Sequence, residues 1–187
     1  YESYQPVIKF ISDAADDPDV LAVKMTLYRT GRDSPIVKAL ERAARNGKQV
    51  TVLVELKARF DEERNIAWAN ELEKAGVIVI YGLVNLKVHA KILMVIRRES
   101  DSIRRYMHIA TGNYNPKTAK MYSDLSLFTA NQEIANDATS FFNLVTGYST
   151  LQTMKHLSMA PVTMKSRILA MIQREIDRTE AGGQGLI

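Results

Sequence analysis

A histidine and a lysine two residues apart, His89 and Lys91, interrupt an apolar run at residues 86–97. The run predicts a buried strand, in which side chains two apart project to the same face. A polar pair there must meet water, a polar network or a site. A neighbouring cation favours the neutral, nucleophilic imidazole near pH 7 and can neutralise charge on a phosphate under attack. We interpret the pair as a phosphate-handling site, with a structural histidine as the alternative.

Two arginines, Arg29 and Arg59, each follow the carboxyl end of a predicted parallel strand, at residues 20–28 and 49–56. Ligands of α/β sheets bind at that edge. The planar guanidinium matches phosphate oxygens, so the two arginines form a plausible phosphate clamp. A loop arginine paired with a nearby carboxylate is the alternative for each.

Four further residues are candidates. Gly112 allows a close backbone approach, and Asn113 offers both a donor and an acceptor, although the pair is also typical of a turn. Asp124 can accept a hydrogen bond from an imidazole N–H and so fix its tautomer. Tyr122 can stack on a base or cover the core. The other two histidines of the chain, His108 and His156, are interpreted as structural.

Hydrophobic periodicity supplies the elements that would position these residues. It predicts an α/β fold that begins with β-α-β-α-β units, in which short connections imply parallel strands covered by helices. A hairpin follows. The predicted strands are residues 20–28, 49–56, 77–81, 86–97, 105–110, 124–128 and 157–160. The predicted helices are residues 3–15, 35–46, 62–75, 131–146 and 161–179, of which the second begins at a capping Ser34 before Pro35.

Composition narrows the class of protein. The 187 residues include no cysteine, which excludes disulfides and cysteine chemistry, and the net charge of +4 suits an anionic ligand. The P-loop and protein-kinase signatures are absent from the sequence, and no residue cluster predicts a dedicated metal cage. With no signal peptide and no apolar run that could span a membrane, we expect a cytoplasmic protein, with peripheral membrane attachment as the alternative. Tyr1 stands inside helix-forming sequence, so we also expect a fragment of a longer chain.

The pattern of His89-Ala90-Lys91 with Gly112-Asn113 resembles that of the phospholipase D superfamily, although Ile96 stands where its HxK(x)4D motif has an aspartate. Five short motifs in order resemble the polyphosphate kinase 1 family, which has phospholipase D-like catalytic domains without that aspartate. These motifs are Leu27-Tyr28-Arg29, Val54-Glu55-Leu56-Lys57-Ala58-Arg59-Phe60-Asp61-Glu62, Lys87-Val88-His89-Ala90-Lys91, Thr111-Gly112-Asn113-Tyr114-Asn115 and Tyr122-Ser123-Asp124.

The resemblance implies a phospholipase D-like mixed sheet with flanking helices. It implies reversible transfer of the terminal phosphate of ATP to inorganic polyphosphate through a phosphohistidine on His89. Arg29 and Arg59 would contact a magnesium–phosphate assembly, with no inner-sphere protein ligand identified. Tyr122 would contact the nucleotide, and Asp124 would orient His89.

The resemblance also implies how the chain is divided. Residues 1–160 would form the catalytic domain with the nucleophile, and residues 161–187 would begin a second phospholipase D-like domain that supplies another histidine. The fragment alone would carry half a site. We expect a homo-oligomer for the full-length protein and no nucleic-acid partner. Two alternatives stay open, a phospholipase D-like phosphodiesterase and a non-catalytic module that binds polyanions.

Overall fold

The computed structural model describes residues 3–28, 34–55, 62–82, 86–147, 150 and 153–187, and side chains within these ranges except at 62–65. Its helices are α1 (Gln5–Asp16), α2 (Pro35–Arg45), α3 (Glu62–Lys74), α4 (Gln132–Val145) and α5 (Met164–Glu180), with a short 3-10 turn at Thr118–Lys120. Its strands are β1 (Val20–Leu27), β2 (Gln49–Val54), β3 (Ile78–Tyr81), β4 (Lys91–Arg98), β5 (Ile103–Ala110) and β6 (Ser126–Thr129).

The six strands form one mixed sheet in the order β3-β2-β1-β4-β5-β6. β1, β2 and β3 pair in parallel, as the β-α-β-α-β prediction required. β4 lies antiparallel to β1, and β5 and β6 continue in antiparallel register. One edge of the sheet therefore collects the carboxyl ends of β1, β2 and β5 and the amino ends of β4 and β6.

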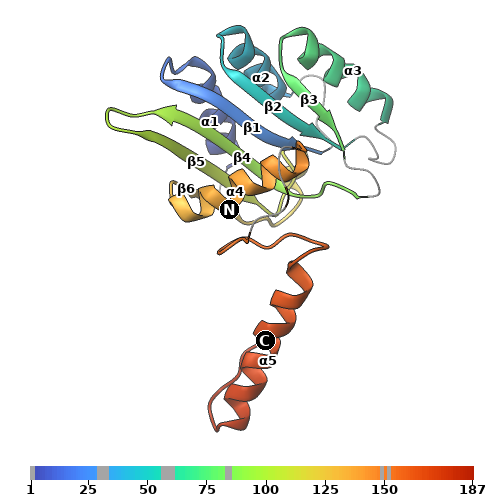
Figure 1. Cartoon of the computed structure of the whole chain (residues 1–187). Helices are drawn as coiled ribbons and strands as arrows, with labels where there is room; N and C mark the ends of the chain where they lie inside the picture. Colours follow the sequence, from blue (N-terminus) through green and yellow to red (C-terminus); the bar gives the residue numbers. More distant parts are fainter. Residues whose placement is uncertain (1–2, 29–33, 56–61, 83–85, 148–149, 151–152) are drawn as a thin grey trace.

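Helices cover both faces of the sheet, with α1, α2 and α3 on one side and α4 on the other (Figure 1). Strand alternation divides the core accordingly. In β4, Leu93 and Val95 belong to the cluster under α1, α2 and α3, whereas Ile92 and Met94 belong to the cluster under α4. Both faces of the strand are thus apolar, which explains why it reads as a continuous hydrophobic run.

Helix α4 also holds the segment that leads to α5. Asn131 caps α4 by accepting from the backbone N–H groups of Glu133 and Ile134 at 2.9 and 3.2 Å. The buried Asp137 accepts three further backbone N–H groups, those of Lys155, His156 and Leu157, at 3.1, 2.7 and 2.9 Å. Helix α5 then extends away from the sheet (Figure 1) and has no buried residue.

Several predicted boundaries are wrong. The strand predicted at 157–160 is absent from this described stretch, because side chains satisfy its backbone: Asp137 bonds the Leu157 N–H, and Arg167 donates to the Leu157 carbonyl at 3.2 Å. The last helix begins at Met164, three residues after Pro161, and β6 begins at Ser126 rather than at 124. Ser34 precedes α2 as predicted, but its side chain makes no capping hydrogen bond.

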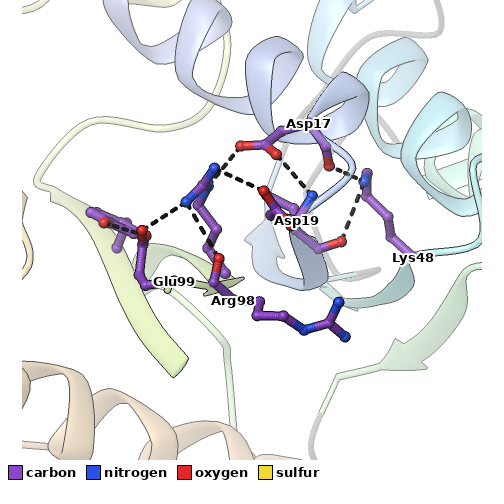
Figure 2. Close-up of polar contacts among 8 residues, drawn as sticks. Asp17, Asp19, Lys48, Arg98 and Glu99 are labelled. Atoms are coloured by element: carbon purple, nitrogen blue, oxygen red, sulfur yellow. Dashed lines mark hydrogen bonds and ion pairs between the residues drawn. The ribbon is translucent and has the colours of Figure 1, made fainter. Parts of the chain in front are cut away.

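The edge of the sheet opposite the candidate residues is closed by ion pairs (Figure 2). Arg97, near the end of β4, pairs with Asp17, Asp19 and Glu99 at 2.8, 3.3 and 2.7 Å. Lys48 donates to the backbone carbonyl of Asp17 before β1. This network ties the β4–β5 hairpin to the start of β1 and leaves the other edge for the candidate site.

Candidate active site

The sheet topology brings most of the predicted site residues to one edge. Lys91 is the first residue of β4, and it pairs with Ala110, the last residue of β5. Thr111, Gly112 and Asn113 follow directly, and Asp124 stands two residues before β6. Antiparallel register therefore gathers residues that are far apart in the sequence.

His89 and Lys91, which the sequence predicted to share one face of a strand, are in direct contact. The Lys91 Nζ atom lies 2.9 Å from His89 Nδ1 and donates to the His89 carbonyl oxygen at 2.6 Å. Lys91 is 5% exposed, whereas His89 is exposed. A buried cation is thus held against an accessible imidazole.

His89 itself precedes the strand, and the prediction of a strand from residue 86 is wrong. Residues 87–90 run outside the sheet ladder, and β4 begins at Lys91. Here the side chains of Glu55, which follows β2, and of Thr26 in β1 make hydrogen bonds to the backbone in place of a neighbouring strand. Glu55 accepts the Val88 N–H at 2.8 Å, and the Thr26 hydroxyl donates to the Ala90 carbonyl at 2.7 Å.

Tyr28, the residue after β1, packs under the pair. Its ring lies edge-on to the His89 imidazole, with centroids 5.5 Å apart and an interplanar angle of 75°. The ammonium groups of Lys87 and Lys91 lie 5.6 and 5.9 Å from the centre of the same ring. Such contacts stabilise a cation beside an aromatic face.

The electrostatics of Lys91 are unusual. Burial lowers the pKa of Lys91 to about 8, and the negative charge of Asp124 partly opposes the shift. The lysine is therefore a cation near pH 7 that can lose its proton under mildly alkaline conditions. A cation with few competing waters is well suited to neutralising a phosphate oxygen.

Asp124 is fixed by the turn after β5. The Thr111 hydroxyl donates to Asp124 Oδ1 at 3.0 Å and accepts the Leu125 N–H at 3.0 Å. A Cβ atom on Gly112 would lie 2.3 Å from Asp124 Oδ2, so glycine is required for this close approach. The contact predicted between Asp124 and His89 stays a prediction.

Two predicted ligand-binding residues, Asn113 and Tyr122, lie in different environments. The Asn113 Oδ1 atom is buried without a hydrogen-bond partner among the described residues. Tyr122 is 68% exposed, so its ring does not cover the core. Arg29 and Arg59, and most of the motif around Arg59, lie outside the described residues.

The remaining histidines are held by structural contacts. His108 is 1% exposed, its Nδ1 lies 2.9 Å from the Tyr114 hydroxyl, and burial lowers its pKa to about 4. His156 Nε2 lies 2.8 Å from a carboxylate oxygen of Glu133 on α4. Both contacts agree with the structural interpretation.

Sequence reasoning assigned no role to Thr26, Tyr28, Glu55 and Thr111. Thr26 and Glu55 are polar positions within or directly after otherwise apolar strands, which is the same signal that singled out His89 and Lys91. Both are 2% exposed. The signal was present, but nothing in the sequence indicates that their partners lie more than thirty residues away, as the contacts of Val88 and Ala90 show.

A cavity of about 800 Å³ lies beside the pair. His89 and Lys91 form part of its wall, and apolar side chains of residues 86–92, the end of β5, α4 and the segment at 154–164 form most of the rest. Ile92, Phe141 and Met159 are examples. The site thus opens onto an apolar recess.

The described residues do not form a metal cage, since no group of three or more histidine or carboxylate side chains converges among them. Among the described residues, Glu55 and Asp124 are acidic residues at this edge, and Asp124 accepts a hydrogen bond from Thr111. Magnesium commonly binds through substrate phosphates and few protein carboxylates.

The described part of the chain also contains no helix that is long and apolar enough to cross a membrane.

The fold defines a class. The structure resembles that of a phospholipase D family member, Nuc from Salmonella typhimurium, with a TM-score of 0.54 at 17% identity, over 75% of this chain and 84% of that one. The mixed sheet flanked by helices thus has a phospholipase D-like fold.

The comparisons also define the family. Residues 1–151 match the family model described as polyphosphate kinase C-terminal domain 1, and the chain belongs to that family. It is 57% identical over 187 residues to a polyphosphate kinase of Halalkalibacterium halodurans and 58% identical over 188 residues to one of Synechocystis sp.. The match covers all of this chain but 26% of each relative, so the chain spans about a quarter of their length.

A solved structure agrees with this assignment. The crystal structure of polyphosphate kinase from Porphyromonas gingivalis matches with a TM-score of 0.86 at 36% identity, over 97% of this chain and 30% of that one. The predicted fold and family are confirmed.

Proposed function

We propose that the full-length protein is a polyphosphate kinase that transfers the terminal phosphate of ATP reversibly to inorganic polyphosphate, with His89 as the phosphorylated group. The contact between Lys91 Nζ and His89 Nδ1, 2.9 Å long, carries the proposal, since it places a buried cation beside an exposed nucleophile. Membership of the polyphosphate kinase family supports the choice of reaction.

The chemistry is a two-step displacement. In the first step an imidazole nitrogen attacks the γ-phosphorus, a P–N bond forms, and the bond to the ADP oxygen breaks. In the second step a terminal oxygen of polyphosphate attacks the phosphohistidine, and the P–N bond breaks. Phosphoryl transfer depends mainly on positioning and on neutralising the oxygens of the transferred group.

Lys91 would contribute both to positioning His89 and to neutralising the transferred phosphate. While its ammonium donates to His89 Nδ1, the neutral imidazole carries its own proton on Nε2 and has no free lone pair. A phosphate oxygen is a stronger acceptor, so binding of the γ-phosphate would draw Lys91 away from Nδ1. The same movement would release the attacking lone pair and neutralise the phosphate.

The other predicted residues would complete the site. Arg29 and Arg59 follow β1 and β2 in the sequence and would hold the nucleotide phosphates by paired hydrogen bonds. Tyr122, with its exposed ring, would stack on the base, and Asn113 would contact the nucleotide or its phosphates. Mg²⁺ would enter bound to the nucleotide phosphates, where it would supply further charge neutralisation.

The rest of the proposal concerns the longer protein. Residues 161–187 would begin a second phospholipase D-like domain that brings another histidine to the site. The full-length protein would form homo-oligomers. A single domain that contributes only one active-site histidine, His89, would then be insufficient for turnover.

The test is an assay of the full-length protein with three possible outputs. We expect polyphosphate synthesis from ATP, ATP synthesis from polyphosphate and ADP, and loss of both by at least about 1000-fold in His89→Gln, because the covalent route is removed. Cleavage of phosphatidylcholine or DNA without phosphotransfer would instead indicate a phosphodiesterase. Salt-sensitive polyphosphate binding that is unchanged in His89→Gln, without turnover, would indicate a binding module.

A further inference from the structure

We propose that Thr26 and Glu55 are positioning residues, which hold the backbone on either side of His89 and Lys91 so that the two side chains meet. The inference rests on the proposed function, because it assumes that His89 is the nucleophile. Neither residue reaches the reacting atoms in this proposal. Both act through the segment at 88–92.

Glu55 fixes the segment just before His89. It is the residue after β2, 2% exposed, and its own N–H donates to the Leu27 carbonyl at 3.1 Å, which continues the pairing with β1. Its side-chain Oε2 accepts the Val88 N–H at 2.8 Å. The carboxylate therefore joins the end of the parallel sheet to the residue that precedes the nucleophile.

Thr26 fixes the segment just after His89. It is also 2% exposed and lies in β1. Its hydroxyl donates to the Ala90 carbonyl at 2.7 Å and accepts the Ile92 N–H at 3.1 Å. One side chain thus binds the backbone on both sides of Lys91.

The two contacts explain how an irregular segment can hold a precise geometry. Residues 87–90 have no strand ladder, yet the Val88 N–H and the Ala90 carbonyl, which flank His89, are both bonded to buried side chains. The buried side chains of Val88 and Ile92 pack in the cluster under α4. With the backbone fixed, Lys91 Nζ reaches both the ring and the carbonyl oxygen of His89.

The chemistry of Glu55 favours a functional role over a purely structural one. A buried carboxylate loses its hydration, which is unfavourable unless hydrogen bonds replace it. A charged acceptor gives a shorter and stronger bond to an N–H than a neutral acceptor does. Strong fixation is most useful beside a nucleophile, where a displacement of about 1 Å can lower the rate about 100-fold.

The experiment uses the full-length enzyme and compares substitutions that remove each bond with substitutions that keep it. Thr26→Val removes the hydroxyl at nearly constant shape, and Thr26→Ser keeps it. Glu55→Leu removes the acceptor, and Glu55→Gln keeps a neutral one. Thr51→Val, at a buried threonine of β2 that is 6% exposed, controls for general loss of stability.

We expect Thr26→Val and Glu55→Leu to lower kcat, and the single-turnover rate of phosphoenzyme formation, by about tenfold to 100-fold. The KM for ATP should stay within about twofold, because the nucleotide contacts are unchanged. Glu55→Gln should lose about threefold to tenfold in kcat, since a neutral acceptor binds more weakly. Thr26→Ser and Thr51→Val should keep kcat within about threefold of wild type.

A merely structural role predicts a different result. The thermal midpoint would then fall in Thr26→Val and Glu55→Leu while kcat per folded molecule stayed at the level of Thr51→Val, and that result would overturn the proposal. If Glu55→Leu does not fold, an unchanged kcat in both Glu55→Gln and Thr26→Val overturns it equally. A wild-type enzyme without polyphosphate synthesis would contradict the proposed function, which the wild type tests separately from the variant ratios.

Discussion

Lys91 combines deep burial with two contacts to the same neighbour, the ring and the backbone oxygen of His89. A lysine in this position can act only while it is protonated, because the neutral amine carries no charge for a phosphate oxygen. Its proton affinity depends on burial and on the distance to Asp124. The burial of Lys91 and its position near Asp124 therefore predict that the reaction rate depends on pH.

The rate of phosphoenzyme formation in the full-length protein should fall as the pH rises through about 8. The sign follows from the pKa of Lys91, which burial lowers to about 8, so the ammonium is lost above that pH. Asp124 raises this pKa, and Asp124→Asn should move the alkaline fall of the residual rate to lower pH. The pH dependence of the rate would be measured by stopped flow or quenched flow between about pH 6 and 10.

The matched control is Asp101→Asn, which removes an exposed carboxylate in the β4–β5 turn at the opposite edge of the sheet. Its pH profile should match that of wild type. An alkaline limb that is unaffected by Asp124→Asn, or one that persists unchanged in Lys91→Met, would show that another group titrates. Lys91→Met should also lower the rate about 100-fold at pH 7.

At the scale of elements, the turn after β5 determines where Asp124 lies. Thr111 bonds the carboxylate and the following backbone, and Gly112 makes room for it. The Asp124 side chain is short, so it cannot avoid a new Cβ atom without leaving Thr111. A change at Gly112 should therefore alter the site through Asp124.

Gly112→Ala should lower phosphoenzyme formation about tenfold and destabilise the protein by about 1–3 kcal/mol, as overpacking does. The physical reason is the 2.3 Å separation between the added Cβ and Asp124 Oδ2. Rates and thermal midpoints of the full-length variant would measure both effects. Gly182→Ala is a control for backbone strain alone, since Gly182 has a φ of +83° and a Cβ there meets no atom within 4 Å. It should lower the thermal midpoint but leave the rate unchanged.

Hydrophobic periodicity and turn residues predicted most helices and strands, because local patterns determine where elements such as β1, α2 and β2 form. The rule for β-α-β units then predicted that β1 and β2 are parallel. Local patterns failed where a backbone is satisfied by distant side chains. Thr26 and Glu55 take the place of a ladder before β4, and Asp137 does the same at 155–157. No local pattern reports such contacts. The strand predicted at 86–97 therefore begins only at Lys91, and the strand predicted at 157–160 was wrong.

The candidate site was predictable to a similar degree. The spacing of His89 and Lys91 predicted a shared face, and the two side chains are in contact although His89 lies before β4. Gly112 predicted a close backbone approach, and the Asp124 side chain is the group that approaches it. The hydrogen bonds that Thr26 and Glu55 make to the backbone around His89 were not predictable. Thr26 lies 64 residues from Ala90 in the sequence, and Glu55 lies 33 residues from Val88. These contacts depend on how β1, β2 and β4 are ordered in the sheet.

At the scale of the whole molecule, the described surface indicates where further contacts could form. Helix α5 extends away from the sheet (Figure 1). Its side chains Ile168, Leu169 and Ile176 are exposed, and an apolar cavity lies between α4 and the segment before α5. The relatives are about four times as long as this chain. We therefore expect the activity only in the full-length protein.

The most direct test of the central claim is labelling of the full-length protein with ATP that carries a radioactive γ-phosphate. We predict one labelled site, at His89, whose bond is labile to acid and stable to base, as expected for a P–N bond. His89→Gln should abolish the label. His156→Gln should keep it, since that histidine pairs with Glu133 on α4. Undiminished labelling of His89→Gln would contradict the account.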